Sequence, residues 1–186
     1  MAIVFMDKKI IFITGGVRSG KSQFAMNLAE EFPGPKAYLA TAQALDEEMA
    51  RRIGNHQKSR PKDWQTFEEP LSVSKVVRDN GNDLALILLD CVTLWISNAM
   101  MAGWNESRVL EETETFLSEC RKARCSVILV GNEVGWGIVP DNPAARIFRD
   151  LSGSVQQKMA READEVYFLV SGIPQRIKAS PHTHGA

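Results

Sequence analysis

The chain has 186 residues, of which 44% are hydrophobic and 24% are charged, and its formal net charge is −1. This length suffices for one well-filled core, and the composition excludes wholesale disorder. The near-neutral charge and the lack of any Lys/Arg run argue against a nucleic-acid partner, and the longest strongly apolar stretch, 84–89, is too short to span a membrane. We expect a single domain over residues 1–178 and a flexible tail over 179–186.

The compartment is inferred from the cysteines and from the first residues. Cys91, Cys120 and Cys125 are odd in number and lack the spacing of metal ligands, which favours reduced thiols. The first six residues have no basic segment of the kind that opens a signal peptide. We therefore expect a cytoplasmic protein.

The first predicted strand, 9–14, leads into a motif that fits the phosphate-binding loop pattern G-x-x-x-x-G-K-[ST] without a mismatch. The motif consists of Gly15, Gly16, Val17, Arg18, Ser19, Gly20, Lys21 and Ser22. A predicted helix over 22–32 follows, which completes the strand–turn–helix context of this motif. Backbone N–H groups of the loop can face phosphates, Lys21 is expected to reach the β- and γ-phosphates, and Ser22 is expected to bind Mg²⁺. The chain is thus predicted to bind a nucleoside triphosphate.

The second predicted strand, 36–41, precedes a predicted helix over 45–58 that carries His56, the only histidine before the tail. The inward stripe of this helix is formed by Leu45, Met49 and Ile53, and His56 stands one turn beyond it. The cations around it are Arg51, Arg52, Lys58 and Arg60. They disfavour the imidazolium form, and they could also stabilise phosphate charge. From these residues alone, a neutral nucleophile and an ordinary histidine at a helix end both remain open.

A predicted helix over 71–79 precedes the strand 84–90, which ends at Asp90. In phosphate-loop proteins, a carboxylate at the end of a buried strand helps to hold Mg²⁺, directly or through water. The same carboxylate could instead cap the next predicted helix, 93–102. We favour the metal role, with Ser22 and Asp90 as the two candidate ligands.

After a predicted helix over 106–123 and a strand over 126–131, a long loop runs from Asn132 to Pro140. An open α/β sheet builds its substrate site from loops that follow the carboxyl ends of strands. Trp136 offers a flat apolar surface, and Glu133 is a possible acid or base. The alternative is an ordinary loop with a packed tryptophan.

The chain closes with a predicted helix over 143–161, a strand over 164–170 and a short final strand over 175–178. This alternation predicts an α/β protein with the three-layer P-loop NTPase fold and a mainly parallel sheet. No N-K-x-D tetrapeptide is present, which weighs against a switch GTPase.

Several motifs together resemble the bifunctional adenosylcobinamide kinase / adenosylcobinamide-phosphate guanylyltransferases of cobalamin biosynthesis. The resemblance extends from about Lys9 to Lys178. It rests on the phosphate loop, Ala40-Thr41-Ala42, the segment Arg52 to Trp64 around His56, Asp90-Cys91, the loop Asn132 to Pro140, and Ala163-Asp164-Glu165-Val166. The phosphate loop occurs in very many families, whereas the His56 segment and the Asn132–Pro140 loop are specific.

The resemblance implies two reactions. A γ-phosphoryl group passes from ATP or GTP to the aminopropanol hydroxyl of adenosylcobinamide. The histidine that matches His56 then attacks the α-phosphorus of GTP and releases pyrophosphate, and adenosylcobinamide phosphate takes up the bound GMP to give adenosylcobinamide-GDP. It also implies a homo-oligomer, with a trimer as the expected state.

The nucleotide contacts that the resemblance implies are Gly15 to Ser22, Ala40, Thr41, Ala42, Gln57, Lys58, Ser59, Arg60, Glu68 and Asp90. The chain departs from some relatives, which carry a second histidine in place of Asn55 and a basic residue in place of Gln57. The expected site is therefore less positively charged, but it keeps its nucleophile.

Two other functions are compatible with the phosphate loop. A monofunctional P-loop small-molecule kinase would use Lys21, Ser22 and Asp90 but would give His56 no task. A nucleotide-controlled binding module would change its partner with nucleotide state and would need no small-molecule acceptor. Only a guanylyltransferase should retain label from α-labelled GTP.

Overall fold

The computed structural model describes residues 8–44, 46–59 and 63–179. Its centre is a seven-stranded sheet with the order β3-β2-β4-β5-β1-β6-β7. The strands are β1 (Ile10–Gly15), β2 (Lys36–Ala40), β3 (Gln65–Glu68), β4 (Leu86–Asp90), β5 (Ser126–Asn132), β6 (Glu165–Val170) and β7 (Ile173–Lys178). All pairs are parallel except β6 with β7, which form an antiparallel hairpin.

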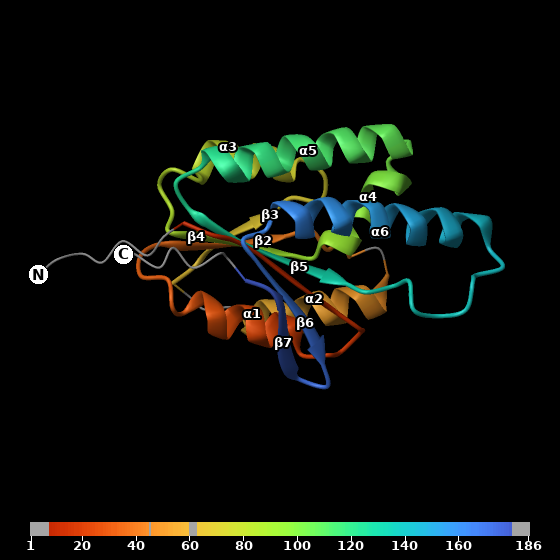
Figure 1. The fold of residues 1–186 in the computed structure, drawn as a ribbon, viewed down its shortest axis with the longest axis horizontal. Helices are drawn as coiled ribbons and strands as arrows, with labels where there is room; N and C mark the ends of the chain where they lie inside the picture. The colour runs from red at the N-terminus through yellow and green to blue at the C-terminus, as the bar shows by residue number, and fades with distance from the viewer. Residues whose placement is uncertain (1–7, 45, 60–62, 180–186) are drawn as a thin grey trace, which may run out of the picture.

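Six helices cover the two faces of this sheet in the described part of the chain. They are α1 (Lys21–Ala29), α2 (Glu47–Ser59), α3 (Val73–Asn80), α4 (Val92–Met101), α5 (Glu106–Lys122) and α6 (Pro143–Glu162). Figure 1 shows α1 and α2 on one face and the other four helices on the opposite face. The expected three-layer α/β fold with a mainly parallel sheet is therefore confirmed.

Each face of the sheet carries its own apolar core, because successive residues of a strand point to opposite faces. On β1, Ile10 and Phe12 belong to the larger cluster beneath α3 to α6, whereas Ile11 and Ile13 belong to the cluster beneath α1. The central strands are buried on both sides and consequently read as continuous apolar runs. Because β5 pairs in parallel with both β4 and β1, the carboxyl ends of these three strands lie next to one another.

Two helix starts that the sequence predicts are confirmed in detail. The side chain of Asn105 accepts a hydrogen bond from Arg108 N at 2.9 Å, and that of Asn142 accepts one from Ala144 N at 2.8 Å. Pro143 occupies the first turn of α6, where a missing N–H costs nothing. These caps set the ends of the connections that lead into α5 and α6.

The sequence-based interpretation misses one strand and shortens another. β3 was not expected, because Gln-Thr-Phe-Glu is short and polar and lies at the edge of the sheet, with only Phe67 partly buried. β7 begins at Ile173, so Ile173 and Pro174 lie in the strand rather than in the turn before it. Pro174 is tolerated because β7 is the other edge strand.

The three cysteines are buried and unpaired, as the reduced-thiol interpretation expects. Burial raises the pKa of the Cys125 thiol to about 11, so this thiol stays protonated at neutral pH. None of the helices in the described ranges combines the length and the apolarity that a membrane crossing requires. The expected flexible tail falls almost wholly outside the described residues, as do Leu45 and Arg60.

Candidate nucleotide-binding and catalytic site

The phosphate loop connects β1 to α1 and depends on two glycines. Gly20, the residue just before α1, has a φ of 90°, a left-handed conformation that glycine adopts without strain. At Gly15, a Cβ atom would lie 2.5 Å from the carbonyl oxygen of Leu169 on β6. The loop is also tied to the β6–β7 turn, where Gly172 N donates to Ser19 O at 2.9 Å. The loop thus lies directly against the hairpin.

Lys21 lies inside the loop, and only 6% of its surface is exposed. Its Nζ donates to Gly16 O at 2.6 Å and to Ser19 Oγ at 3.3 Å. Burial lowers the pKa of the Lys21 ammonium, and the nearby Asp90 carboxylate acts in the opposite direction. Among the described residues, the ammonium donates only to these neutral groups of the loop, so it is suited to exchange them for phosphate oxygens.

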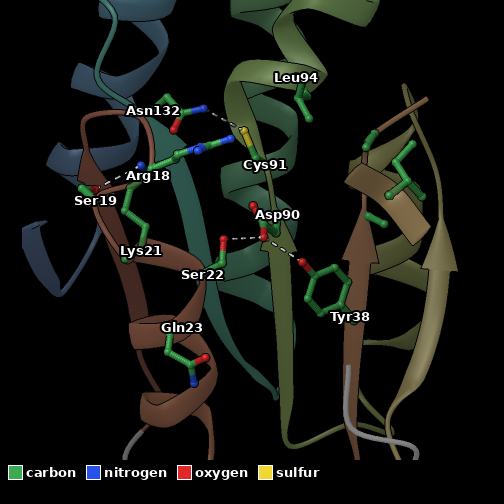
Figure 2. A pocket seen from close by; sticks show the side chains of 14 residues that line it. Arg18, Ser19, Lys21, Ser22, Gln23, Tyr38, Asp90, Cys91, Leu94 and Asn132 are labelled. Carbon is green, nitrogen blue, oxygen red and sulfur yellow. Dashed lines mark hydrogen bonds between the residues drawn. The ribbon is translucent and has the colours of Figure 1, made fainter. Parts of the chain in front are cut away.

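Ser22 at the start of α1 and Asp90 at the end of β4 lie next to each other, although they are far apart in the chain. Ser22 Oγ donates to Asp90 Oδ2 at 2.9 Å, and Tyr38 on β2 donates its hydroxyl to the same oxygen at 2.7 Å (Figure 2). The residue that caps α4 is Cys91, and it makes no side-chain capping bond. Asp90 therefore faces the phosphate loop and does not serve as the cap of α4.

The ends of β2 and β4 are joined by Thr41, which is fully buried. Its hydroxyl donates to Cys91 O at 2.8 Å and accepts from Cys91 N at 2.9 Å, and its carbonyl accepts a bond from Asn98 Nδ2 at 2.7 Å. These contacts hold the backbone that follows Asp90. In the expected segment Ala40–Ala42, both alanines line the cavity described next, whereas the Thr41 side chain points into the protein.

A cavity of about 450 Å³ lies over the phosphate loop. It is lined by Arg18, Ser19, Gly20, Lys21, Ser22, Gln23, Tyr38, Ala40, Ala42, Ile53, Asp90, Cys91, Leu94 and Asn132. Figure 2 shows Lys21 rising from the loop on one side and Tyr38 on the other, with Asp90 between them. Arg18, which has a φ of 56°, extends across the cavity toward Cys91 and Asn132. The cavity has the size of a small-molecule site.

Asn132 connects this cavity to the loop that the sequence singles out. Its carbonyl accepts from Gln156 Nε2 at 2.9 Å, while Gln156 Oε1 accepts from Thr14 Oγ1 at 3.0 Å. The next residue, Glu133, donates its backbone N–H to Gly15 O at 2.9 Å. The start of the Asn132–Pro140 loop is thus bonded to β1, α6 and the phosphate loop.

Farther along this loop the side chains are exposed. Trp136 is 81% exposed and contacts Phe168 of β6 with 5.0 Å between the ring centroids, and Ile138 is 96% exposed. The carboxylate of Glu133 accepts a hydrogen bond from Gly135 N within the loop itself. The tryptophan therefore packs against β6 and leaves most of its apolar surface exposed.

Helix α2 carries His56, but the side chain of His56 lies outside the described part of the molecule, together with those of Lys58 and Ser59. Ile53, one turn earlier on the same helix, lines the cavity. The next residue after His56, Gln57, donates to Glu68 Oε1 on β3 at 2.8 Å. Gln57 and Glu68 thus bond to each other, and neither belongs to the cavity lining.

Five lining residues were not expected from the sequence as site residues: Gln23, Tyr38, Ile53, Cys91 and Leu94. Tyr38 could have been found from the period of β2, because it lies two residues before Ala40 and so on the same face of the strand. Gln23 and Leu94 carry no signal of their own in the sequence. They line the cavity because they follow Ser22 and Thr93 at the starts of α1 and α4.

The donor set suits a magnesium ion that is shared with a nucleotide. Mg²⁺ prefers oxygen ligands and is usually held by one or two protein groups together with substrate phosphates and water. Ser22 Oγ and the Asp90 carboxylate supply such oxygens at one edge of the cavity. No group of three His, Cys, Asp or Glu residues able to hold a metal by itself occurs among the residues that the structure covers.

Comparison with known proteins identifies one family. The family model described as cobinamide kinase / cobinamide phosphate guanyltransferase matches residues 11–177. The chain is 38% identical to the bifunctional adenosylcobalamin biosynthesis protein CobU of Escherichia coli, with 91% of this chain and 99% of that protein covered. It is 39% identical to the protein of the same name from Salmonella typhimurium, with the same coverage. It is also 39% identical to the CobP protein of Pseudomonas aeruginosa, with 91% and 97% covered.

Solved structures with lower sequence identity share the fold. The RadB recombinase superposes with a TM-score of 0.52 at 16% identity, over 86% of this chain and 73% of that one. An ATPase of a bacterial type III secretion system superposes with a TM-score of 0.54 at 13% identity, over 87% and 52% of the two chains. At such identities the likeness concerns the fold alone.

Proposed function

The chain belongs to the cobinamide kinase / cobinamide phosphate guanyltransferase family, and on this premise we propose how its residues divide the two reactions between them. The enzyme phosphorylates cobinamide and transfers a guanylyl group to cobinamide phosphate. In our proposal the substrates are adenosylcobinamide and its phosphate, the phosphoryl donor is ATP or GTP, and residues 1–178 act as one domain. The observation that carries the assignment of residues is the meeting of Lys21, Ser22 and Asp90 at one cavity.

In the kinase step, the aminopropanol hydroxyl attacks the γ-phosphorus and the bond to the β-phosphate oxygen breaks. Lys21 gives up Gly16 O and Ser19 Oγ and binds the phosphates, where it neutralises the charge that spreads over the transferred group. Backbone N–H groups of the loop at the start of α1 bind further phosphate oxygens. Arg18 supports the same step, because its side chain lies in the cavity.

Ser22 and Asp90 are the residues that would hold Mg²⁺. When bound, the ion supplies positive charge to the phosphate oxygens and orients the triphosphate. The protein's own contribution is geometric. Ser22 and Asp90 come from α1 and β4, two elements that the parallel sheet holds side by side.

In the guanylyl step, an imidazole nitrogen of His56 attacks the α-phosphorus of GTP and pyrophosphate leaves. A phosphate oxygen of adenosylcobinamide phosphate then displaces the histidine, the P–N bond breaks, and adenosylcobinamide-GDP forms. The position of Ile53 supports this role, because residues three apart on a helix lie on one face and Ile53 lines the cavity. The covalent intermediate splits a difficult transfer between two polyanions into two displacements.

Of the remaining expected nucleotide contacts, Gln57 and Glu68 do not line the cavity, and in our proposal they act indirectly. Gln57 and Glu68 join α2 to β3 and would keep the His56 helix over the triphosphate. Lys58, Ser59 and Arg60 would add contacts to the same nucleotide. We propose a homo-oligomer, with a trimer as the expected state, and the apolar side chains of the Asn132–Pro140 loop as part of the corrinoid surface.

Two labels test the proposal against the monofunctional kinase. With adenosylcobinamide and γ-labelled GTP, label should enter the corrinoid as a phosphoryl group. With α-labelled GTP, label should enter the corrinoid only after this first step, with release of pyrophosphate. Transfer of γ-label without any transfer of α-label would favour the monofunctional kinase instead.

A further inference from the structure

We propose that Tyr38 is a positioning residue of the metal site. Its hydroxyl donates to Asp90 Oδ2 at 2.7 Å and, through this bond, holds the Asp90 carboxylate and the Ser22 hydroxyl in the arrangement that receives the Mg²⁺ of the nucleotide. This inference rests on the proposed metal role of Ser22 and Asp90. It assigns a task to a residue that the phosphate-loop motif does not include.

The tyrosine ring is fixed by the sheet. Tyr38 lies on β2 opposite Leu88 of β4, and Asp90 lies two residues further along β4 on the same face. Only 4% of the Tyr38 surface is exposed, and its ring belongs to the apolar cluster between the sheet and α1. A ring so enclosed has few other rotamers available, so its hydroxyl stays where the carboxylate can accept its hydrogen bond.

Two donors on one oxygen restrict the rotation of the carboxylate. Asp90 Oδ2 accepts from Tyr38 on one side and from Ser22 on the other, as Figure 2 shows. Within the described ranges, no hydrogen bond is made to Oδ1. The carboxylate therefore keeps one oxygen for a metal ion or for a water molecule bound to it.

The Ser22 hydroxyl is oriented by the same interaction. A serine hydroxyl has one hydrogen, and in this structure Ser22 donates it to Asp90. Its lone pairs consequently remain available for a cation. If the carboxylate turns, the Ser22 hydrogen loses its acceptor and the hydroxyl can rotate, so Tyr38 influences both candidate ligands through a single bond.

The size of the effect follows from other metal sites. Loss of a group that hydrogen-bonds a metal ligand typically weakens metal affinity or activity by about 10- to 100-fold. Tyr38→Phe removes the hydroxyl and leaves the buried ring in place. We therefore expect about 10-fold weaker binding of the divalent ion with little loss of packing.

The chain offers a matched control, because it has only two tyrosines and both donate to a carboxylate. Tyr167 donates to Glu165 Oε2, also at 2.7 Å, and neither Tyr167 nor Glu165 lines the cavity. Tyr167→Phe thus makes the same chemical change away from the site. Asp90→Asn serves as the reference for loss of the metal ligand itself.

The test is an equilibrium titration of Mn²⁺ by electron paramagnetic resonance, with each variant saturated by a non-hydrolysable GTP analogue. Tyr38→Phe should bind Mn²⁺ about 10-fold more weakly than the unmodified chain, and Tyr167→Phe should bind it equally well. In kinase assays, Tyr38→Phe should need more Mg²⁺ for half-maximal rate and should regain most of its kcat at high Mg²⁺.

Unchanged Mn²⁺ affinity in Tyr38→Phe, with weakened affinity in Asp90→Asn, would overturn the role of Tyr38 and leave the proposed function intact. Unchanged affinity in both variants would overturn the metal role of Asp90 and the inference together. A lower melting temperature of Tyr38→Phe with unaltered Mn²⁺ affinity would show that the hydroxyl serves stability alone, which also contradicts the inference.

Discussion

Replacement of Lys21 by methionine should abolish most of both activities while leaving the fold nearly intact. Lys21 is buried, so methionine keeps most of the packing of the aliphatic stem. The change removes two hydrogen bonds within the loop, to Gly16 O and Ser19 Oγ. It also removes an ammonium whose pKa is lowered by burial. The desolvation cost of this charge disappears with it, which offsets part of the stability lost with the two hydrogen bonds.

The expected change in the free energy of unfolding is therefore within about 1 kcal/mol, or roughly 2–4 °C in melting temperature for a chain of this size. The rates should fall much further. Loss of one group that stabilises transition-state charge commonly lowers kcat by about 100- to 1,000-fold. Both steps should be affected, because both need a triphosphate held at the same loop.

The assay measures γ-label and α-label transfer to the corrinoid beside a thermal melt of the ligand-free protein. Lys9→Met is the matched control. Lys9 pairs with Glu165 at 2.7 Å at the opposite end of β1, so its loss should lower the melting temperature but not the rates. Near-normal turnover of Lys21→Met would refute the reasoning, because the nucleotide would then have to bind elsewhere.

Three further changes test the framework around the site. Asn142→Ala removes the cap of α6 and should lower the free energy of unfolding by about 1 kcal/mol, measured by urea denaturation. Asn142→Asp keeps an acceptor and should lower it little. Equal losses in the two variants would contradict the capping role. Gln156→Leu leaves Thr14 and the Asn132 carbonyl without their partner and should lower the free energy of unfolding by roughly 1–3 kcal/mol. An unchanged denaturation midpoint would contradict this role of Gln156. Burial alone would raise the pKa of Glu165, but hydrogen bonds from Lys9 and Tyr167 lower it below its usual value of 4.5. The folded state thus favours the ionised form, so this stabilisation is present above pH 4.5 and is lost as the pH falls further. The free energy of unfolding should consequently depend less on pH below 4.5 in Glu165→Gln, and an identical acid dependence would contradict this role of Glu165.

The sequence was sufficient to predict the architecture and the part of the site where the phosphate loop meets Asp90. The motif from Gly15 to Ser22 and a carboxylate at the end of a buried strand predicted the meeting of Ser22 and Asp90, which are 68 residues apart in the chain. That prediction works because parallel strands place their carboxyl ends along one edge of the sheet.

The rest depends on contacts between segments that carry no pattern of their own. The role of Tyr38 depends on the pairing of β2 with β4, which the order of strands along the chain does not reveal. β3 resembles a polar turn because an edge strand needs little apolar surface. The bond between Gln57 and Glu68 likewise depends on the placement of β3 beside β2.

The central claim is that a single site carries out both reactions with His56 as the nucleophile of the second. Incubation with Mg²⁺ and α-labelled GTP, followed by mass spectrometry of peptides, tests it most directly. The account predicts one GMP per chain, attached to His56 through a P–N bond that acid cleaves and alkali does not, and predicts that His56→Ala loses the adduct and the guanylyl transfer but keeps kinase activity. A full adduct on the His56→Ala protein, or an adduct that alkali removes and acid does not, would contradict it.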